Sequence, residues 1–438
     1  MTSDAMPELP ATPPPLVWAG PECAFLRVNG DDRDQLRATG HAVRDGDLRR
    51  LAALGVRGVR QPLLWGWTPR AGSGRRATEA TRGWADRRMA TLEGLGMEPV
   101  LALLHHGSGP RGTSFLDPDF PRTFAAYARG VAEAYPWVTT YLPINEPTTT
   151  ARFAGLYGFW EPHGRSSRAF AEILLAQCRA IRAAVREIRA VNPAARFIVN
   201  EDVGVVRSTP RLEHQARFDT ERRWAAVDLL SGRLVAGHRL WAYLVAALGS
   251  DAPLLDFVDD PCPPDVIGLD YYVTSDRFLD HRVAAYPRWT HGGNGVQRYA
   301  DVELVRIEGE EIAGWDGIIA EASSRYGLPL ALTEVSLAGD PVDACAWWLE
   351  AWEAATSAAA RGVRVEAVTA WAAFGARGWE QMLVEPEGVY APGLFDVSAT
   401  PPAPTLLGDV VRAAAHGAAS PPLRPGWWRQ PERTLYAA

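Results

Sequence analysis

The stretch PVLALLHHGSGPRGTSFLDPDFPRTFAAYARGVAEAYPWVTTYLPINE, residues 99–146, contains one strand–helix–strand unit. Its two short apolar runs, at 99–106 and 138–146, are typical of strands that are buried on both faces. Between them, residues 120–135 have the pattern of a helix. Strands joined through a helix in this way lie parallel in α/β proteins, so the unit predicts a parallel sheet covered by helices.

The same alternation recurs along the whole chain. The apolar runs rich in β-branched and aromatic residues lie at 16–20, 58–65, 99–106, 138–146, 196–202, 266–272, 328–334 and 365–374. Helical patterns fall between them, for example at 47–55 and 169–191. Eight such units predict a single (β/α)8 TIM barrel, a fold that commonly occupies about 250 to more than 400 residues with insertions. An open doubly wound sheet is the alternative, but no GxGxxG follows the first run.

We expect three segments along the chain. Residues 1–15 form a flexible, Pro-rich leader, residues 16–420 form the catalytic barrel, and residues 421–438 form a Pro-rich tail. The long stretch 203–265 is predicted to be an insertion over the C-terminal face of the barrel. The leader has no signal-peptide pattern, and no apolar stretch approaches the roughly 20 residues needed to cross a bilayer. These features predict a cytoplasmic protein with no membrane partner.

The composition excludes several classes of function. Of 438 residues, 47% are hydrophobic and 22% charged, which is typical of a folded chain with a large core. The net charge of −7 argues against a nucleic-acid partner, because such proteins usually carry a basic surplus. The chain has no lysine, which excludes pyridoxal phosphate bound as a Schiff base and Walker-type phosphate loops. Its four cysteines form no CxxC pair, and we expect neither a metal nor an organic cofactor.

Polar side chains gather at the ends of several predicted strands, where barrels of this kind carry their catalytic groups. They are Arg60, His105, His106, Asn145, Glu146, Asp270, Tyr271, Tyr272, Thr333 and Glu334. Glu146 and Glu334 end the fourth and seventh runs, so we expect them to face each other across the barrel mouth. Glycoside hydrolysis requires such a pair, one acid to protonate the leaving oxygen and one carboxylate to attack the anomeric carbon or activate water.

Several segments around these residues resemble glycoside hydrolase family 1, the β-glucosidases. VTTYLPINEPTTTARFAGLYGFWEPHG (138–164) is similar to the family's acid/base region, with a strand ending in Asn-Glu-Pro, a small-residue helix and a Gly-Tyr-Gly-like turn. LPLALTEVSLAG (328–339) stands where the family has its Thr-Glu-Asn-Gly nucleophile. Further segments similar to the family's strands two, three, six and eight are RQPLLW (60–65), LLHHGSGP (103–110), DVIGLDYYVTSDRF (265–278) and WAAFGARGW (371–379). The resemblance stays in register over roughly residues 16–400.

This resemblance implies an exo-acting retaining β-glycosidase with Glu146 as acid/base and Glu334 as nucleophile. The residues that it implies for substrate binding are Arg60, His106, Asn145, Tyr272, Trp371, Trp379 and, as a substitute for the family's strand-one Gln, Glu22. Arg60 would hold the pKa of Glu334 low while Tyr272 donates a hydrogen bond to it. The nearby charge of Glu334 would raise the pKa of Glu146, so that Glu146 starts protonated.

The chain departs from the family pattern at positions that contact the sugar or the nucleophile. The replaced positions are Gly107, Asp270, Val335, Ser336 and Gly378. Gly378 stands where the family has the Glu that grips O4 and O6 of the sugar, so we expect weak discrimination at those hydroxyls. The mechanism therefore transfers to this chain, which resembles a divergent branch, while the identity of the sugar does not.

Two other functions fit the same residues. A transglycosidase would use the same covalent intermediate with a sugar acceptor in place of water. A carbohydrate-binding barrel without catalysis would fit the altered sugar-gripping positions, although it has no need of the paired carboxylates. In each case the partner is a small-molecule glycoside or an oligosaccharide, and the sequence leaves the oligomeric state open.

Overall fold

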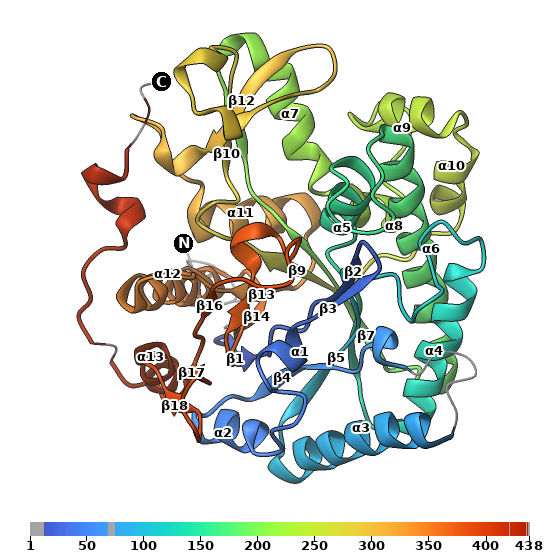
Figure 1. Ribbon diagram of the computed structural model, residues 1–438, viewed down its shortest axis with the longest axis vertical. Helices are drawn as coiled ribbons and strands as arrows, with labels where there is room; N and C mark the ends of the chain where they lie inside the picture. The colour runs from blue at the N-terminus through green and yellow to red at the C-terminus, as the bar shows by residue number, and fades with distance from the viewer. Residues whose placement is uncertain (1–12, 69–74, 420, 435, 437–438) are drawn as a thin grey trace, which may run out of the picture.

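Eight parallel strands close a barrel (Figure 1). The computed structural model describes residues 13–68, 75–419, 421–434 and 436, so residues 1–12 of the expected leader lie outside the described residues. The barrel strands are β1 (Leu16–Ala19), β4 (Gly58–Pro62), β5 (Glu98–His105), β6 (Thr140–Asn145), β7 (Arg196–Asp202), β9 (Val266–Asp270), β13 (Leu330–Val335) and β14 (Val365–Ala370). Their order is β1-β14-β13-β9-β7-β6-β5-β4. Each strand comes from one of the eight apolar runs, which confirms the predicted TIM barrel.

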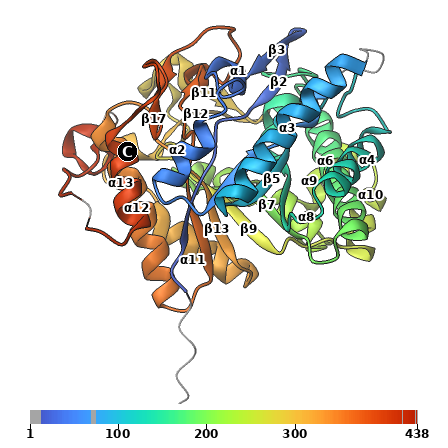
Figure 2. The same ribbon diagram turned by 90° about the horizontal axis from the view of Figure 1, so that it is seen from below.

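Helices surround the barrel on its outer side (Figures 1 and 2). The main ones are α2 (Asp47–Ala53), α3 (Arg75–Leu95), α4 (Phe120–Ala134), α6 (Ser167–Val191), α11 (Gly314–Tyr326), α12 (Pro341–Ala360) and α13 (Leu406–Ala415). The three expected helical patterns correspond to α2, α4 and α6. Helix α6 begins after Ser166, whose hydroxyl accepts the backbone N–H of Ala169 and so caps the first turn. Within the described residues, no helix is both long and apolar enough to cross a membrane.

Side chains fill the N-terminal half of the barrel. Trp18 lies there against a ring of apolar side chains from six other strands, Val100, Leu142, Ile198, Val266, Ala331 and Ala367. The remaining strand, β4, contributes Gly58 at this level, and a Cβ at that position would lie 2.4 Å from the Trp18 indole. The glycine therefore makes room for the tryptophan. This packed layer separates the polar pair of Thr140 and Glu98 at the N-terminal end from the predicted site residues at the C-terminal end.

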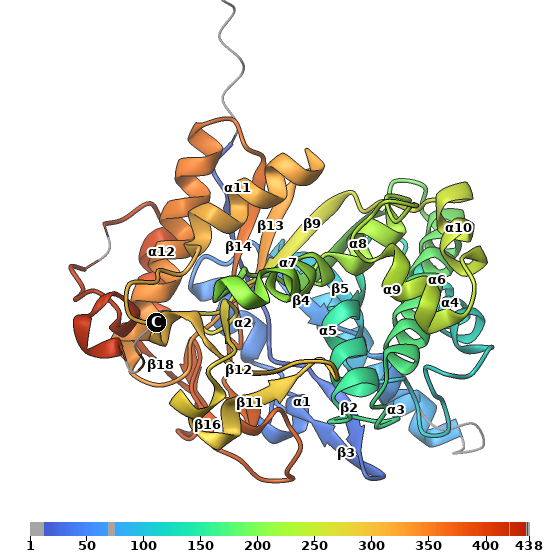
Figure 3. The same ribbon diagram turned by 90° about the horizontal axis from the view of Figure 1, so that it is seen from above.

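The stretch 203–265 divides into two parts, which corrects the expectation that all of it covers the C-terminal face. It contains β8 (Val206–Ser208), α7 (Glu213–Arg222), α8 (Ala225–Leu230), α9 (Trp241–Leu248) and α10 (Ala252–Asp259). Strand β8 joins β10 (Arg277–Asp280), β11 (His291–Gly293) and β12 (Arg298–Glu303) in a second sheet beyond the ends of β7 and β9 (Figure 3). Helices α8 and α9 instead pack on α6, which is buried along most of its surface and needs this second layer.

The C-terminal segment lies against the barrel. Trp428 is buried, its ring lies 5.3 Å from that of Trp347 on α12, and its Nε1–H donates to Glu350 at 3.1 Å. The guanidinium of Arg306 lies 4.1 Å over the ring of Trp427. The expected tail 421–438 therefore connects α12 with the second sheet over its described residues.

Candidate active site

Glu334 is held by two donors at the mouth of the barrel, the buried Arg60 and the partly buried Tyr272. Nη1 of Arg60 lies 2.6 Å from its Oε1, and the hydroxyl of Tyr272 donates to its Oε2 at 2.5 Å. Glu334 is 4% exposed and Arg60 1% exposed, so this ion pair is shielded from water. Since both partners stabilise the ionised carboxylate, the contacts favour a charged Glu334.

Glu146 directly follows β6 in a strained backbone conformation. Its φ of 42° lies in the left-handed region, which costs a residue other than glycine about 1–3 kcal/mol. Its Oε1 is buried and has no hydrogen-bond partner among the described residues, while its Oε2 lies 3.7 Å from Nε2 of His106. One of its oxygens lies within 4.8 Å of an oxygen of Glu334. Glu146 thus has one buried carboxyl oxygen without a described partner and lies close to Glu334.

Asp270 adds a third carboxyl group to this pair. One of its oxygens lies within 4.8 Å of those of Glu146 and Glu334. The hydroxyl of Thr333 donates to its Oδ1 and the amide of Asn200 donates to its Oδ2, both at 2.5 Å. Asp270 is fully buried, so the departure from the family's Asn places an extra titratable group next to both glutamates.

The environment raises the pKa of both glutamates, and it raises that of Glu146 further. Burial raises the pKa of Glu146 well above its usual value, and the charges of Glu334 and Asp270 add to the effect. Burial also raises the pKa of Glu334, although Arg60 and Tyr272 oppose it. The expectation that Arg60 keeps this pKa low is therefore wrong, because the loss of solvent outweighs the ion pair. The pKa of Glu146 is raised further because Glu334 alone has Arg60 and Tyr272 as partners, and the proton on Glu146 with the charge on Glu334 stays a prediction.

Asn145 lies at the centre of a buried hydrogen-bond network. Its Oδ1 accepts from Arg60 and, at 2.6 Å, from Nδ2 of Asn200. Its Nδ2 lies 3.2 Å from Nε2 of His105 and 3.4 Å from Nε2 of His106. These contacts fix the orientation of the amide, and its expected contact with a sugar hydroxyl remains a prediction.

His106 and Trp379 meet beside Glu146. The rings of His106 and Trp379 lie 5.7 Å apart, and Trp160 lies 4.8 Å from His106 on another side. Nδ1 of His106 lies 2.9 Å from the hydroxyl of Thr150. Burial, helped by the charge of Arg60, lowers the pKa of His106 to about 3, so the ring is neutral at neutral pH.

Glu22 and Trp371 lie together in the same buried layer. Nε1–H of Trp371 donates to Oε2 of Glu22 at 3.0 Å, and the backbone N–H of Ala24 donates to Oε1 at 2.9 Å. Burial and the charge of Glu334 raise the pKa of Glu22 to about 7. The guanidinium of Arg60 lies 4.2 Å over the ring of Trp371, which covers one of the two faces that a sugar could contact.

A short segment after β14 lies over the mouth of the barrel. Trp379 is part of it, and the backbone carbonyl of Met382 accepts from Nε1 of Trp160 at 2.8 Å. Arg33 donates to the carbonyls of Leu383 and Val384 at 3.2 and 3.1 Å. These bonds hold the segment beside His106, so the structure brings all nine expected site residues to one end of the barrel.

The comparison with solved structures shows which proteins share this fold. No family model matches the sequence, and no curated protein matches it. The structure of β-glucosidase from Thermotoga maritima in complex with glucoimidazole matches with a TM-score of 0.72 at 17% identity, covering 93% of this chain and 98% of that chain. The fold is that of the family 1 β-glucosidases.

Other structures of that enzyme agree. Its complex with deoxynojirimycin has a TM-score of 0.71 at 16% identity, over 94% of this chain and 100% of that chain. The structure described as a family 1 β-glucosidase from Thermotoga maritima has a TM-score of 0.69 at 17% identity, over 93% of this chain and 98% of that chain. The resemblance to family 1 β-glucosidases is thus confirmed at the level of fold, and the low identity agrees with a divergent chain.

Two residues of the site were missed in the sequence. Asn200 bonds to both Asn145 and Asp270, and its Oδ1 accepts the backbone N–H of Glu146 at 3.3 Å. Glu201 accepts the backbone N–H of Thr148 at 2.7 Å, at the start of α5 (Pro147–Ala151), and burial raises its pKa to about 8. Both residues lie near the end of barrel strand β7. The polar end of the run at 196–202 was the signal that the sequence offered for them.

Proposed function

We propose that the chain is a retaining β-glycosidase with Glu334 as nucleophile and Glu146 as acid/base. The observation that carries the proposal is the pair of carboxyl oxygens within 4.8 Å of each other. Retaining enzymes hold their two carboxyl groups about 5–5.5 Å apart, whereas inverting enzymes leave about 6.5–9.5 Å for a water molecule. The short separation supports direct attack by a carboxylate.

In the first step, Glu146 protonates the glycosidic oxygen while Glu334 attacks the anomeric carbon. The bond to the leaving group breaks, and the sugar becomes covalently bound to Glu334. Before the attack, Arg60 and Tyr272 stabilise the charged form of Glu334. When the covalent bond to the sugar later breaks, their hydrogen bonds stabilise the same carboxylate as the leaving group. Every transfer of a proton or an electron pair in this step is made by side chains of the chain and by the substrate.

In the second step, Glu146 takes a proton from water, and the resulting nucleophile attacks the anomeric carbon and releases Glu334. Glu334 carries no charge while it is bound to the sugar, so one cause of the raised pKa of Glu146 is removed at that moment. The group that was an acid in the first step is therefore able to act as a base in the second.

The proposed substrate is a small β-glycoside or the non-reducing end of an oligosaccharide. The Thermotoga maritima structures contain glucoimidazole and deoxynojirimycin, which supports a sugar-sized ligand here as well. A panel of aryl β-glycosides (glucoside, galactoside, fucoside, mannoside and xyloside) would identify the preferred sugar.

The role assignment is tested by product stereochemistry. Proton NMR of wild-type turnover should show the β-sugar first, and added sugar acceptors reveal any transfer activity. In azide, Glu146→Ala should give a β-azide, because azide attacks the covalent intermediate in place of water and needs no general base, whereas Glu334→Ala should give an α-azide from the nucleophile's side. Glu380→Ala, which changes an exposed glutamate in the segment over the mouth, serves as the control. Early release of the α-sugar, or the opposite azide products, would contradict the assignment.

A further inference from the structure

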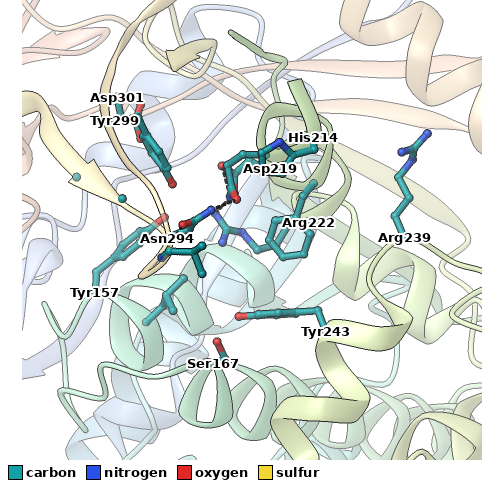
Figure 4. A pocket seen from close by; sticks show the side chains of 16 residues that line it. Tyr157, Ser167, His214, Asp219, Arg222, Arg239, Tyr243, Asn294, Tyr299 and Asp301 are labelled. Carbon is teal, nitrogen blue, oxygen red and sulfur yellow. Dashed lines mark hydrogen bonds and ion pairs between the residues drawn. The ribbon is translucent and has the colours of Figure 1, made fainter. Parts of the chain in front are cut away.

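A pocket of about 810 Å³ lies apart from the candidate active site (Figure 4). Its walls come from α7, α9, the hairpin of β11 and β12, and the turn that follows α5. None of the nine expected site residues lines it. Pockets that bind small ligands measure about 300–1,000 Å³, so this one has the size of a binding site.

Aromatic side chains form a large part of the wall. Tyr157, Tyr243, Tyr299 and Phe218 line the pocket, and the rings of Phe218 and Tyr243 meet edge to face at 5.0 Å. Figure 4 shows the hydroxyl ends of the three tyrosines pointing toward the interior, with Ser167 below them. Such rings offer an apolar face and a polar tip to the same ligand, which suits a sugar ring with C–H faces and hydroxyl edges.

The polar groups of the pocket are already paired with one another. Arg222 lies 2.6 Å from Asp219, whose other oxygen accepts from Nε2 of Gln215 at 3.0 Å. Asn294 of the hairpin turn donates to Gln215 at 2.8 Å. The lining contains two aspartates and two arginines, so its formal charges balance. Within the described part of the chain, Nε of Arg222 is buried and has no hydrogen-bond partner.

Gly292 leaves the pocket open on the hairpin side. It pairs with Tyr299 across the two strands, so a side chain at 292 would lie on the same face as that ring. A Cβ at 292 would meet no described atom within 4 Å, and its φ lies outside the left-handed region. At Gly293, by contrast, a Cβ would lie 2.4 Å from the carbonyl of Gln297. The fold therefore requires a glycine at 293, while at 292 the missing side chain serves only to leave space.

We propose that this pocket binds a short, neutral oligosaccharide, independently of the catalytic carboxylates. The tyrosine rings stack on the sugar faces, and the tyrosine hydroxyls bind the hydroxyl groups. Both aspartates of the lining are already paired with arginines, Asp219 with Arg222 and Asp301 with Arg277, which disfavours a cationic ligand. The second sheet and α7, which the barrel does not need for closure, supply most of this site.

The test fills the pocket from Gly292. Full-length chain with Glu334→Gln, which prevents turnover, is titrated calorimetrically with cellotriose, maltotriose and laminaritriose. At least one should bind, and adding Gly292→Tyr should weaken its binding about tenfold or more. The matched control is Arg298→Tyr, which places the same ring on the opposite face of the hairpin because its neighbour Tyr299 faces the pocket. It should change the dissociation constant less than about twofold.

Tyr243→Ala gives a second, independent measure, since it removes a stacking face instead of filling space, and thermal melting checks that each variant is folded. The proposal is overturned if none of the three trisaccharides binds the Glu334→Gln chain. It is also overturned if the folded Gly292→Tyr and Tyr243→Ala variants bind as tightly as that parent. Because binding is measured without turnover, these outcomes are separate from any failure of the proposed catalysis.

Discussion

Arg60 and Glu334 stand 274 positions apart in the chain, yet Nη1 of Arg60 lies 2.6 Å from Oε1 of Glu334. Their strands, β4 and β13, are separated in the barrel by β1 and β14, so the ion pair spans the barrel interior. Both side chains are buried, and removal of either would leave the other as an unpaired buried charge. The barrel closure itself therefore determines the electrostatics of the proposed nucleophile.

Tyr272→Phe should shift the acidic limb of the pH profile of kcat/KM to higher pH. The hydroxyl of Tyr272 stabilises the ionised form of Glu334, so its loss raises the pKa of that carboxyl further. A hydrogen bond to a charged group contributes about 1.5–3 kcal/mol, so we expect kcat/KM to fall about tenfold to a hundredfold at neutral pH. The measurement is kcat/KM against pH, with the buried Tyr271→Phe as the neighbouring control. An unchanged acidic limb would contradict the role of Tyr272.

Asp270→Asn should shift the alkaline limb of the pH profile of kcat/KM to lower pH. Asp270 contributes to the raised pKa of Glu146, and Asn keeps its size while it removes a titrating group. Because the three carboxyls titrate together, fewer acidic groups allow Glu146 to lose its proton at lower pH. The pH profile of kcat/KM measures the shift, with the wild-type chain in the same buffers as the reference. An alkaline limb that stays in place would refute the coupling.

The chain should discriminate weakly at O6 of the sugar. Gly378 offers no carboxylate, and Glu380 is exposed with its Oε1 accepting the backbone N–H of Val389 at 2.7 Å. Glu22 already accepts from Trp371 and Ala24. We therefore expect kcat/KM for an aryl β-glucoside and for its 6-deoxy analogue to agree within about tenfold. A preference of about a thousandfold for the 6-hydroxylated sugar would show that another group grips O6.

His238→Gln should reduce stability in a pH-dependent way. Burial alone would lower the pKa of His238, but hydrogen bonds to Asp228 and Glu221 raise it to about 9. A folded-state pKa above the unfolded value near 6.5 gives stability that is complete below about pH 6.5 and lost as the pH rises through about 9.

Urea unfolding should therefore show the largest loss for His238→Gln near about pH 6 and little difference above about pH 10. His214→Gln, at an exposed position on α7, is the matched control. Arg325 contacts both acids at 2.5 Å and remains in the variant, so we expect the cluster to stay folded. A loss of stability that does not vary with pH would contradict the charge on His238.

The barrel could be predicted because each of its strands is a short apolar run between polar turns. The last residue of each strand could not be predicted, since apolar residues continue past the point where the strand ends. Leu63 and Leu64 are buried after β4 has ended, and the last apolar run extends beyond Ala370. The path of 203–265 was not predictable, because the outer helices cover α6 through contacts that no local pattern describes.

Most of the site residues could be predicted from their place at the ends of the strands, and the others from the resemblance to family 1. The surroundings of these side chains could not be predicted in either way. A sequence shows that Arg60 can pair with Glu334, and it does not show how completely the pair is buried, which decides the direction of the pKa shift. Trp371 was expected as a sugar platform, and its packing against Arg60 depends on the barrel geometry. The hydrogen-bonding role of Asn200 was missed because this residue of β7 bonds to Asn145 of β6 and to Asp270 of β9, which lie far from it in the sequence.

The indole of Trp18 against Gly58 closes the N-terminal end of the barrel. Substrate and product of the proposed reaction must therefore use the C-terminal mouth. A larger residue at 58 would have to displace this indole, so its cost falls on the packing of the barrel and not on the carboxylates at the other end.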